Sequence, residues 1–154
     1  MMRKTAGVFL VKNDGTILVG HPTNHNINFF SIPKGGVDEG ESLIEAAIRE
    51  TYEEANVDIC DFKTIHTLSP RIHKNGKKIL YPYVLFEGEN DYIFDEFELR
   101  CNSNVPVKDG GFPEMDSFKF LSFDEARIYL HPTQIDCIDE IEKRFNKQIK
   151  KKNE

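Results

Sequence analysis

The sequence has few cysteines and no long apolar run. Its 154 residues include three cysteines, Cys60, Cys101 and Cys137, and none belongs to a C-x-x-C pair. An odd, widely spaced set of this kind indicates neither a disulfide framework nor a zinc site, so we interpret all three as buried or idle thiols. No apolar segment is long enough to span a bilayer, and no small-residue cleavage site follows the short N-terminal apolar run. We therefore expect a cytoplasmic protein without membrane attachment.

The chain also lacks an excess of basic residues. Its formal net charge is −6 at pH 7, whereas broad binding to nucleic-acid backbones requires a basic face that displaces counterions. The one basic run is KQIKKKNE, residues 147–154, which we interpret as a tail or a solvated helix end. Residues 1–146 are enough for one domain and too few for two. A phosphorylated small molecule still fits an acidic protein when metal ions and local cations neutralise it.

Hydrophobic patterning and turn residues predict the order of strands and helices. Asn13-Asp14-Gly15 and Asn75-Gly76 are typical of turns between paired strands, and Pro33-Lys34-Gly35-Gly36 is expected to interrupt a strand. Extended segments are expected at residues 5–11, 17–19, 29–32, 62–68, 79–86, 97–100 and 117–121. Helices are expected at residues 42–55, 123–130 and 132–145.

The first of these helices carries the most informative pattern. Ser42 and Glu45 fit a capping box at its start, and Asn56 tolerates the left-handed backbone that often ends a helix. We expect one side to face the core and the other, charged side to face away. The predicted core stripe consists of Ile44, Ala47, Ile48, Thr51, Tyr52 and Ala55.

Glu50, Glu53 and Glu54 stand at i, i+3 and i+4, so their carboxylates project from one region of the helix. Their mutual repulsion becomes attraction when a divalent cation binds, and hard oxygen donors without His or Cys select Mg²⁺ or Mn²⁺. The preceding Gly35 and Gly36 let backbone groups approach a metal or phosphate, and Lys34 adds a cation. The alternative is that three glutamates form only a solvated helix face.

A longer motif surrounds these glutamates. The segment GGVDEGESLIEAAIRETYEEANV, residues 35–57, resembles the Nudix box, G-x5-E-x7-R-E-U-x-E-E-x-G-U, in which U is a bulky aliphatic residue. The departures are Thr51 at an aliphatic position and Asn56 at the glycine. The flanking segments SIPKGG and FPEMDSFKFLSFDEA are also similar to the family. The resemblance implies an α+β fold, an α/β/α sandwich with a mixed, partly antiparallel central sheet.

The resemblance also implies a reaction, the attack of water on phosphorus with Mg²⁺ or Mn²⁺ as cofactor. Carried over by position, Glu50, Glu53 and Glu54 ligate the metal. Glu53 or a glutamate from a later loop is the general base, and Glu114 is our candidate for that later residue. An exposed loop acid is the alternative interpretation of Glu114.

Three further positions of the motif receive supporting roles from the resemblance. Arg49 is similar to the family arginine that orients a catalytic glutamate, for which its rigid fork of donors is suited. Glu41 supports that network. Gly35 contributes a backbone carbonyl to the metal, or is simply a turn glycine.

The sequence says less about the substrate, because the motif specifies the reaction while other segments select the molecule. The Pro-Lys-Gly lead-in around Lys34 resembles that of diadenosine polyphosphate and diphosphoinositol polyphosphate hydrolases. Of these two substrate classes we favour a dinucleoside polyphosphate. Tyr81 or Tyr83 is a candidate for stacking on a base, with strand packing as the alternative. The ribbon around the Asn75-Gly76 turn is basic and contains Arg71, His73, Lys74, Lys77 and Lys78. These side chains either bind a polyphosphate or are simply solvated.

Other substrates and roles stay open. Pro70 is a possible counterpart of a proline in ADP-ribose and nucleotide-sugar hydrolases, although Arg71 follows it instead of glycine. Nucleoside triphosphates are a further alternative, and the only nucleic-acid partner considered is an RNA 5′ end. A nucleotide sensor without catalysis is the alternative from another class, and a homodimer is left open.

Overall fold

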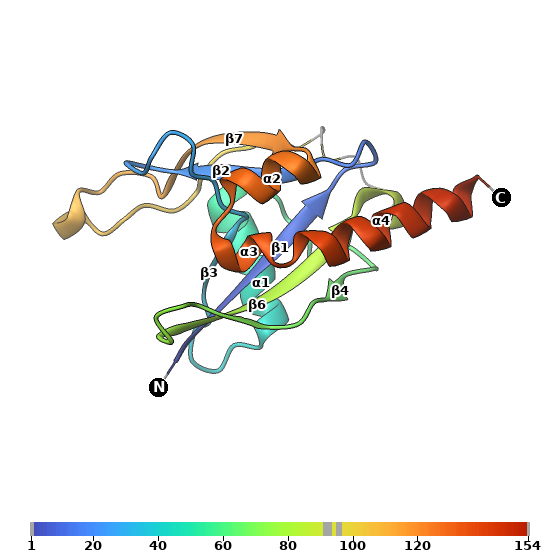
Figure 1. Ribbon diagram of the computed structural model, residues 1–154. Helices are drawn as coiled ribbons and strands as arrows, with labels where there is room; N and C mark the ends of the chain where they lie inside the picture. The colour runs from blue at the N-terminus through green and yellow to red at the C-terminus, as the bar shows by residue number, and fades with distance from the viewer. Residues whose placement is uncertain (1, 91–93, 95–96, 154) are drawn as a thin grey trace.

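The computed structural model describes residues 2–90, 94 and 97–153, and Figure 1 shows the arrangement of its helices and strands. The strands are β1 (Arg3–Val11), β2 (Ile17–Pro22), β3 (Lys34–Gly36), β4 (His66–Thr67), β5 (Arg71–Ile72), β6 (Lys78–Phe86) and β7 (Met115–Leu121). The helices are α1 (Leu43–Ala55), α2 (Phe123–Tyr129), α3 (Pro132–Ile135) and α4 (Ile138–Lys152), with 3-10 turns η1 (Glu87–Glu89) and η3 (Val107–Asp109).

The strands form one mixed sheet around β1. Their order is β4-β6-β1-β2-β7, with β3 also paired to β1 and β5 to β6. β1 and β6 are parallel along their whole length, from Arg3 opposite Lys78 to Val11 opposite Phe86, whereas β1–β2 and β2–β7 are antiparallel. The expected mixed, partly antiparallel sheet is confirmed.

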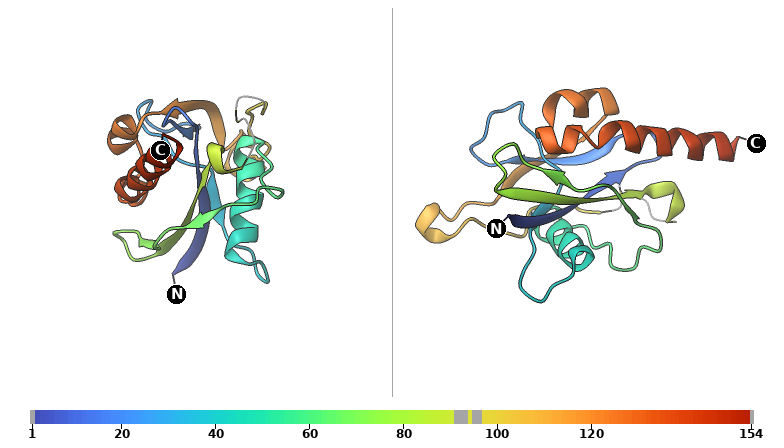
Figure 2. Two further views of the ribbon diagram at one scale, coloured as in Figure 1. Left: turned by 90° about the vertical axis from the view of Figure 1, so that its right-hand side faces the viewer. Right: turned by 60° about the horizontal axis from the view of Figure 1, so that its bottom comes forward.

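Helices cover both faces of this sheet. Figure 2 shows α1 on one face and α2 with α4 on the other. Successive residues of β1 point to opposite faces of the sheet. Val8 and Leu10 pack in the cluster under α1, whereas Phe9 and Val11 pack in the cluster under α2–α4. Because both faces are covered, the strand is a nearly continuous apolar run instead of an alternating one. The expected α/β/α sandwich is therefore confirmed.

α1 begins and ends where its sequence predicts. The Ser42 hydroxyl accepts a hydrogen bond from the Glu45 backbone N–H, and Asn56 ends the helix with φ 61° and ψ 29°. The Glu45 carboxylate accepts a bond from the Ser42 hydroxyl instead of from the Ser42 backbone, so the box is incomplete. Thr51 is fully buried and its hydroxyl donates to the Ala47 carbonyl at 2.7 Å.

The expected core stripe of α1 is confirmed except at Tyr52, because Ala47, Thr51 and Ala55 are buried and Ile44 and Ile48 pack against the core. The buried residues of the helix are Ala46, Ala47, Glu50, Thr51, Glu54 and Ala55. Tyr52, expected in the core stripe, is 47% exposed. Two of the three glutamates are thus buried, and the interpretation of a merely solvated face does not hold.

The strand expected at residues 29–32 and the turn expected at residues 33–36 differ from the observed structure. Residues 29–32 form isolated bridges instead of a strand, because Ser31 exchanges both backbone bonds with Gly20 while the Ile32 N–H bonds to the side chain of Gln134. The expected turn at residues 33–36 contains β3, which pairs with β1. A buried glutamine side chain thus replaces a strand partner, which no local pattern indicates.

Two other expected strands are shortened or absent. Within residues 62–68 the strand is limited to His66–Thr67, with one further backbone bond from the Leu68 N–H to the Pro82 carbonyl of β6, because the Thr64 N–H bonds to the side chain of Asn90. Residues 97–100 form no strand. Arg100 donates its backbone N–H to the Ala55 carbonyl, so this segment completes the end of α1 instead of extending the sheet.

The expected helix at residues 132–145 is two helices. α3 ends at Ile135 and α4 begins at Ile138. The break lets Gln134, 1% exposed, reach Ile32 while Ile138 and Ile141 of α4 enter the core. α4 continues to Lys152, so most of the basic run is the end of this helix.

No helix in residues 2–90, 94 and 97–153 has the length and apolar character needed to cross a membrane. The three cysteines are free thiols, and only Cys137 is fully buried.

Candidate active site

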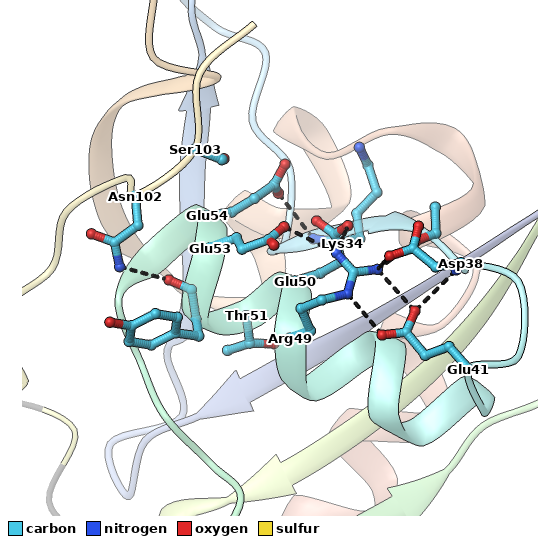
Figure 3. A network of polar contacts seen from close by, with 12 residues as sticks. Lys34, Asp38, Glu41, Arg49, Glu50, Thr51, Glu53, Glu54, Asn102 and Ser103 are labelled. Atoms are coloured by element: carbon cyan, nitrogen blue, oxygen red, sulfur yellow. Dashed lines mark hydrogen bonds and ion pairs between the residues drawn. The ribbon is translucent and has the colours of Figure 1, made fainter.

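Three glutamates of α1 lie around the β3 segment that carries Lys34 (Figure 3). Glu50 is 8% exposed and Glu54 is 3% exposed, whereas the Glu53 side chain is 38% exposed. Burying charged carboxylates costs free energy unless partners compensate them. The surroundings of Glu50 and Glu54 therefore decide what this site can do.

Gly35 is a glycine because Glu50 occupies the space of a side chain there. A Cβ atom built on Gly35 would lie 2.2 Å from the Glu50 carboxyl carbon. Gly35 pairs with Ala6 of β1, on the face that α1 covers. The glycine permits close approach of helix and strand instead of a left-handed turn. The metal role of its carbonyl stays a prediction.

Arg49 uses all of its donors in this site. Its Nε and one Nη hold both oxygens of Glu41 at 2.8 and 3.0 Å. The other Nη donates to Glu50 at 2.8 Å and to Glu53 at 3.0 Å. The fifth bond goes to the Gly36 carbonyl at 2.8 Å. A guanidinium has five N–H donors, so this arginine is saturated.

This network changes the pKa values of Glu41, Arg49 and Glu50. Hydrogen bonds from Arg49 are the main cause that lowers the pKa of Glu41 to about 2. The same pair raises the pKa of Arg49, so both groups stay charged across the physiological range. The pKa of Glu50 is raised because burial outweighs the hydrogen bond and charge of Arg49.

Glu54 is the most strongly perturbed carboxyl group in the cluster. Its Oε1 accepts a hydrogen bond from the Lys34 backbone N–H at 3.0 Å. Burial raises the pKa of Glu54 to about 8, while the charge and backbone N–H of Lys34 oppose the shift. A hydrogen bond to Glu114 and the charge of Glu50 also contribute to this raised pKa. The surroundings of Glu54 therefore favour its protonated form when no cation is bound.

The structure therefore brings Glu114 to the glutamates of α1. Its backbone is held on both sides: its N–H donates to the Ser103 carbonyl at 3.1 Å, and its carbonyl accepts from the Thr23 N–H at 3.0 Å. Glu114 is solvent-exposed yet hydrogen-bonded to a buried carboxyl group. Its role as general base stays a prediction.

The donor set fits a hard divalent cation, although the carboxylates are not yet gathered around one point. Among the residues described, no three His, Cys, Asp or Glu side chains are placed to hold a metal ion. Arg49 holds Glu50 and Glu53 toward itself. A carboxylate cluster with raised pKa values and only oxygen donors matches Mg²⁺ or Mn²⁺, provided that the side chains turn toward the ion.

A cleft of about 360 Å³ begins at Lys34. It lies on the face of the sheet opposite α1, because it is lined by Thr5 and Leu80, which pair with each other across β1 and β6. None of its described lining residues is acidic. Its cationic and aromatic side chains are His25, Phe29, Lys34, His73, Lys78 and His131.

Three histidines line this cleft, and of these the sequence indicated only His73, as part of the basic ribbon. The rings of His73 and His131 lie 4.8 Å apart, and His25 stacks on Phe29 at 5.5 Å. Burial first, and then the nearby cations, lower the pKa values of His73 and His131. Lys34 and the basic ribbon after Pro70 are the sequence signals for this cleft, and neither indicates the distant His131.

The two tyrosines predicted to stack on a base lie on the other face of the sheet. Tyr81 and Tyr83 alternate with Leu80, and Tyr83, 9% exposed, packs in the cluster under α1. Burial raises the pKa of Tyr83. Lys34 and these tyrosines therefore do not line one cleft, and strand packing accounts for Tyr83. A contact between substrate and either tyrosine stays a prediction.

The fold and the site together define an α/β/α domain with two adjoining features. One is a carboxylate centre, formed by Glu50, Glu53, Glu54 and Glu114, and the other is the cleft lined by cationic side chains. A family model described as the NUDIX domain matches residues 1–141, and the chain belongs to the Nudix family.

Several known proteins are similar to this chain. An RNA pyrophosphohydrolase from Sphingopyxis alaskensis is 42% identical over 55 residues, 36% of this chain and 35% of that protein. The chain thus spans about a third of the length of the curated relatives it matches first. The structure of a C. elegans Ap4A hydrolase binary complex has a TM-score of 0.63 at 19% identity, covering 92% of this chain and 98% of that one.

A further similar structure is the NUDIX domain of Shewanella oneidensis NrtR complexed with ADP ribose. It has a TM-score of 0.67 at 15% identity and covers 94% of this chain and 88% of that one. At these identities the two structures show the fold alone.

We expect Mg²⁺ to stabilise the protein more at high pH than at low pH. The folded protein holds the Glu54 proton more tightly than the unfolded chain, so metal-free stability falls as pH rises from about 4.5 to about 8. Metal binding requires the ionised carboxylate, so the rise in Tm with Mg²⁺ should be larger at about pH 8.5 than at about pH 6. Thermal unfolding with Mg²⁺ or EDTA measures this, and an equal rise at both pH values would contradict it.

Arg49→Lys should lower activity by about 10- to 100-fold, because lysine cannot reproduce the two-oxygen bond to Glu41 together with the remaining contacts. The free energy of unfolding should fall by about 1–3 kcal/mol, since Glu50 stays buried with fewer donors. Arg127→Lys is a matched control: Arg127 is 30% exposed against 27% for Arg49 and binds Asp124, Asp139 and Glu142 elsewhere. Equal activity of the two variants would show that the Arg49 network is not needed.

Proposed function

We propose that this chain is a divalent-metal-dependent pyrophosphohydrolase, which cleaves a phosphoanhydride bond in a nucleotide derivative. The observation that carries the proposal is the position of Lys34: its backbone binds Glu54, and its side chain lines the cleft. The carboxylate centre and the basic cleft are therefore joined at one residue. A substrate whose phosphates pass Lys34 would present an anhydride bond to the glutamates.

Glu50, Glu53 and Glu54 would hold the Mg²⁺ or Mn²⁺ ion, with the Gly35 carbonyl as a further ligand. When bound, the ion neutralises phosphate oxygens and lowers the pKa of water. The protein supplies the positions of the donors: Gly35 lets Glu50 approach β3, and the Lys34 N–H fixes one oxygen of Glu54. These contacts favour a preformed framework in which only the carboxylate ends need to turn.

Glu53 and Glu114 are the two candidates for the general base that takes the proton of the attacking water. Glu53 is partly exposed and accepts a hydrogen bond from Arg49 at 3.0 Å. Glu114 is exposed, and its side chain forms a hydrogen bond with Glu54. Because the Glu114 side chain is open to solvent beside Glu54, a predicted metal ligand, we favour Glu114 as the base.

For the substrate we favour a dinucleoside polyphosphate. The cleft combines lysines for phosphates with His25, Phe29 and His131 for an aromatic base. The Ap4A hydrolase among the similar structures agrees with this choice. A nucleotide sensor without catalysis would not require three glutamates, Arg49 and Glu114 in one cluster. A homodimer and a cytoplasmic location stay predictions.

An RNA 5′ end is the second candidate, because relatives that match this chain are RNA pyrophosphohydrolases. A 5′-polyphosphate carries the same anhydride bonds next to a base. The net charge of −6 argues against extended contact with the RNA backbone. Only the first nucleotides would then bind, in the same cleft.

Glu54→Gln should lower the rate of metal-dependent hydrolysis by about 100-fold or more, because a ligand charge is lost. Folding should persist, since an uncharged side chain suits a site where burial already raises the pKa of Glu54. The control is Glu45→Gln, an exposed glutamate of the same helix, which should keep parental activity. The assay separates products by chromatography with Mg²⁺, with Mn²⁺ and with EDTA; parental turnover by the Glu54 variant would exclude the proposed metal site.

Lys78→Ala should raise KM for a dinucleoside polyphosphate by about 3- to 10-fold with little change in kcat, because Lys78 lies in the cleft and not beside the glutamates. The effect should shrink at high salt, which screens exposed charges. Lys77→Ala removes the same charge from the neighbouring position outside the cleft and serves as the control. Steady-state kinetics with diadenosine tetraphosphate and with a 5′-triphosphorylated RNA would rank the two substrates. Equal KM values for the two variants would place the substrate elsewhere.

A further inference from the structure

The C-terminal end of α1 is completed by the segment 98–103. The last four carbonyls of a helix have no partner within it. Here Asn102 donates its backbone N–H to the Glu53 carbonyl at 2.6 Å. Its side-chain amide donates at 3.0 Å to the Tyr52 carbonyl, which also accepts the Asn56 backbone N–H. The Arg100 N–H donates to the Ala55 carbonyl at 3.3 Å. A distant segment thus caps the turn of α1 that carries the catalytic glutamates.

Asn56 fastens this segment from the helix side. Its side-chain N–H donates to the Glu98 carbonyl at 2.8 Å, and its side-chain oxygen accepts from the Asn102 amide at 2.8 Å. The Asn102 oxygen accepts from Arg100 Nε at 3.1 Å. Each amide is oriented by a partner that can only accept or only donate. The glycine that the Nudix box has at position 56 would provide the left-handed backbone but neither side-chain bond.

The capped segment leads directly to Glu114. Ser103, the residue after Asn102, accepts the Glu114 N–H through its carbonyl at 3.1 Å. The intervening excursion is closed by the pairing of Asn104 with Pro113 and by a bond from the Val105 N–H to the Phe112 carbonyl at 2.8 Å. Figure 3 shows Asn102 and Ser103 beside Glu53 and Glu54. Hydrogen bonds therefore hold the backbone of Glu114 in place next to α1.

We propose that Asn56 and Asn102 form an amide latch that positions Glu114 at the carboxylate centre. The latch consists of the two side-chain amides and their bonds to Tyr52 and Glu98. These are positioning residues: they touch no reacting atom, and they act through the backbone of Ser103 and Glu114. The proposal rests on the proposed function, because it assigns the latch a role in the same hydrolysis.

Four variants test the latch. Asn56→Gly keeps the backbone conformation and removes both side-chain bonds, so the protein should fold. Asn102→Ala removes the partner amide, and Glu114→Gln removes the carboxylate that the latch positions. Asn90→Ala is the matched structural control: its amide joins Thr64 and Phe86 through three hydrogen bonds away from the site.

Kinetics give the first measurement. We expect Asn102→Ala to lower kcat by about tenfold and Asn56→Gly by about threefold, with KM changed less than about twofold, because misplaced catalytic groups affect the transition state. In a Glu114→Gln background, Asn102→Ala should cause no further loss, since the two changes disable one function. Asn90→Ala should lower Tm without changing kcat. Additive losses, a parental kcat in both latch variants, or full activity of Glu114→Gln would each overturn the proposal.

Hydrogen exchange gives a second measurement that does not depend on activity. The Glu114 N–H is bonded to Ser103, and its exchange should accelerate at least about tenfold in both latch variants and stay unchanged in Asn90→Ala. An unchanged Glu114 rate in the latch variants would overturn the latch. If the parental protein hydrolysed no substrate with any metal, the proposed function would fail, and the exchange rates would still decide whether the latch holds Glu114.

Discussion

The five hydrogen bonds of Arg49 are the interaction on which the rest of the site depends. They tie Gly36 and Glu41, which precede α1, to Glu50 and Glu53 on the helix itself. Without this cation, a buried Glu50 beside a second carboxylate would be costly. With it, α1 can pack Glu50 against Gly35 and Glu54 against Lys34 of β3. A helix that brings carboxylates into the interior is thereby compatible with a stable domain.

The sequence predicted the framework well where a local pattern and the tertiary contacts agree. β1, β6 and α1 appear as expected, and Asn56 ends the helix as predicted. The predictions failed where side chains replace backbone partners. Gln134 binds Ile32, and Asn90 binds Thr64, so two expected strands are absent or shortened. Hydrogen bonds from distant side chains, which take the place of backbone partners, leave no periodic pattern in the sequence.

For the candidate site, spacing identified the α1 glutamates, and the structure adds how they are held. Burial of Glu50 and Glu54 was not predictable, because a charged helix face is usually solvated. Glu114 was chosen from the sequence, and the structure places it beside Glu54. His131 was missed because its partners lie on distant segments. Asn56 was considered only as a helix-ending residue, whereas its side chain also holds segment 98–103.

The central claim is that the carboxylate centre activates water for attack on an anhydride phosphorus. The most direct measurement is hydrolysis of diadenosine tetraphosphate in ¹⁸O-labelled water with Mg²⁺ or Mn²⁺, with a parallel EDTA sample, followed by mass spectrometry of the products. The account predicts metal-dependent cleavage with one labelled oxygen in a single phosphate product per turnover. Cleavage in EDTA at the same rate, or products without label, would contradict it.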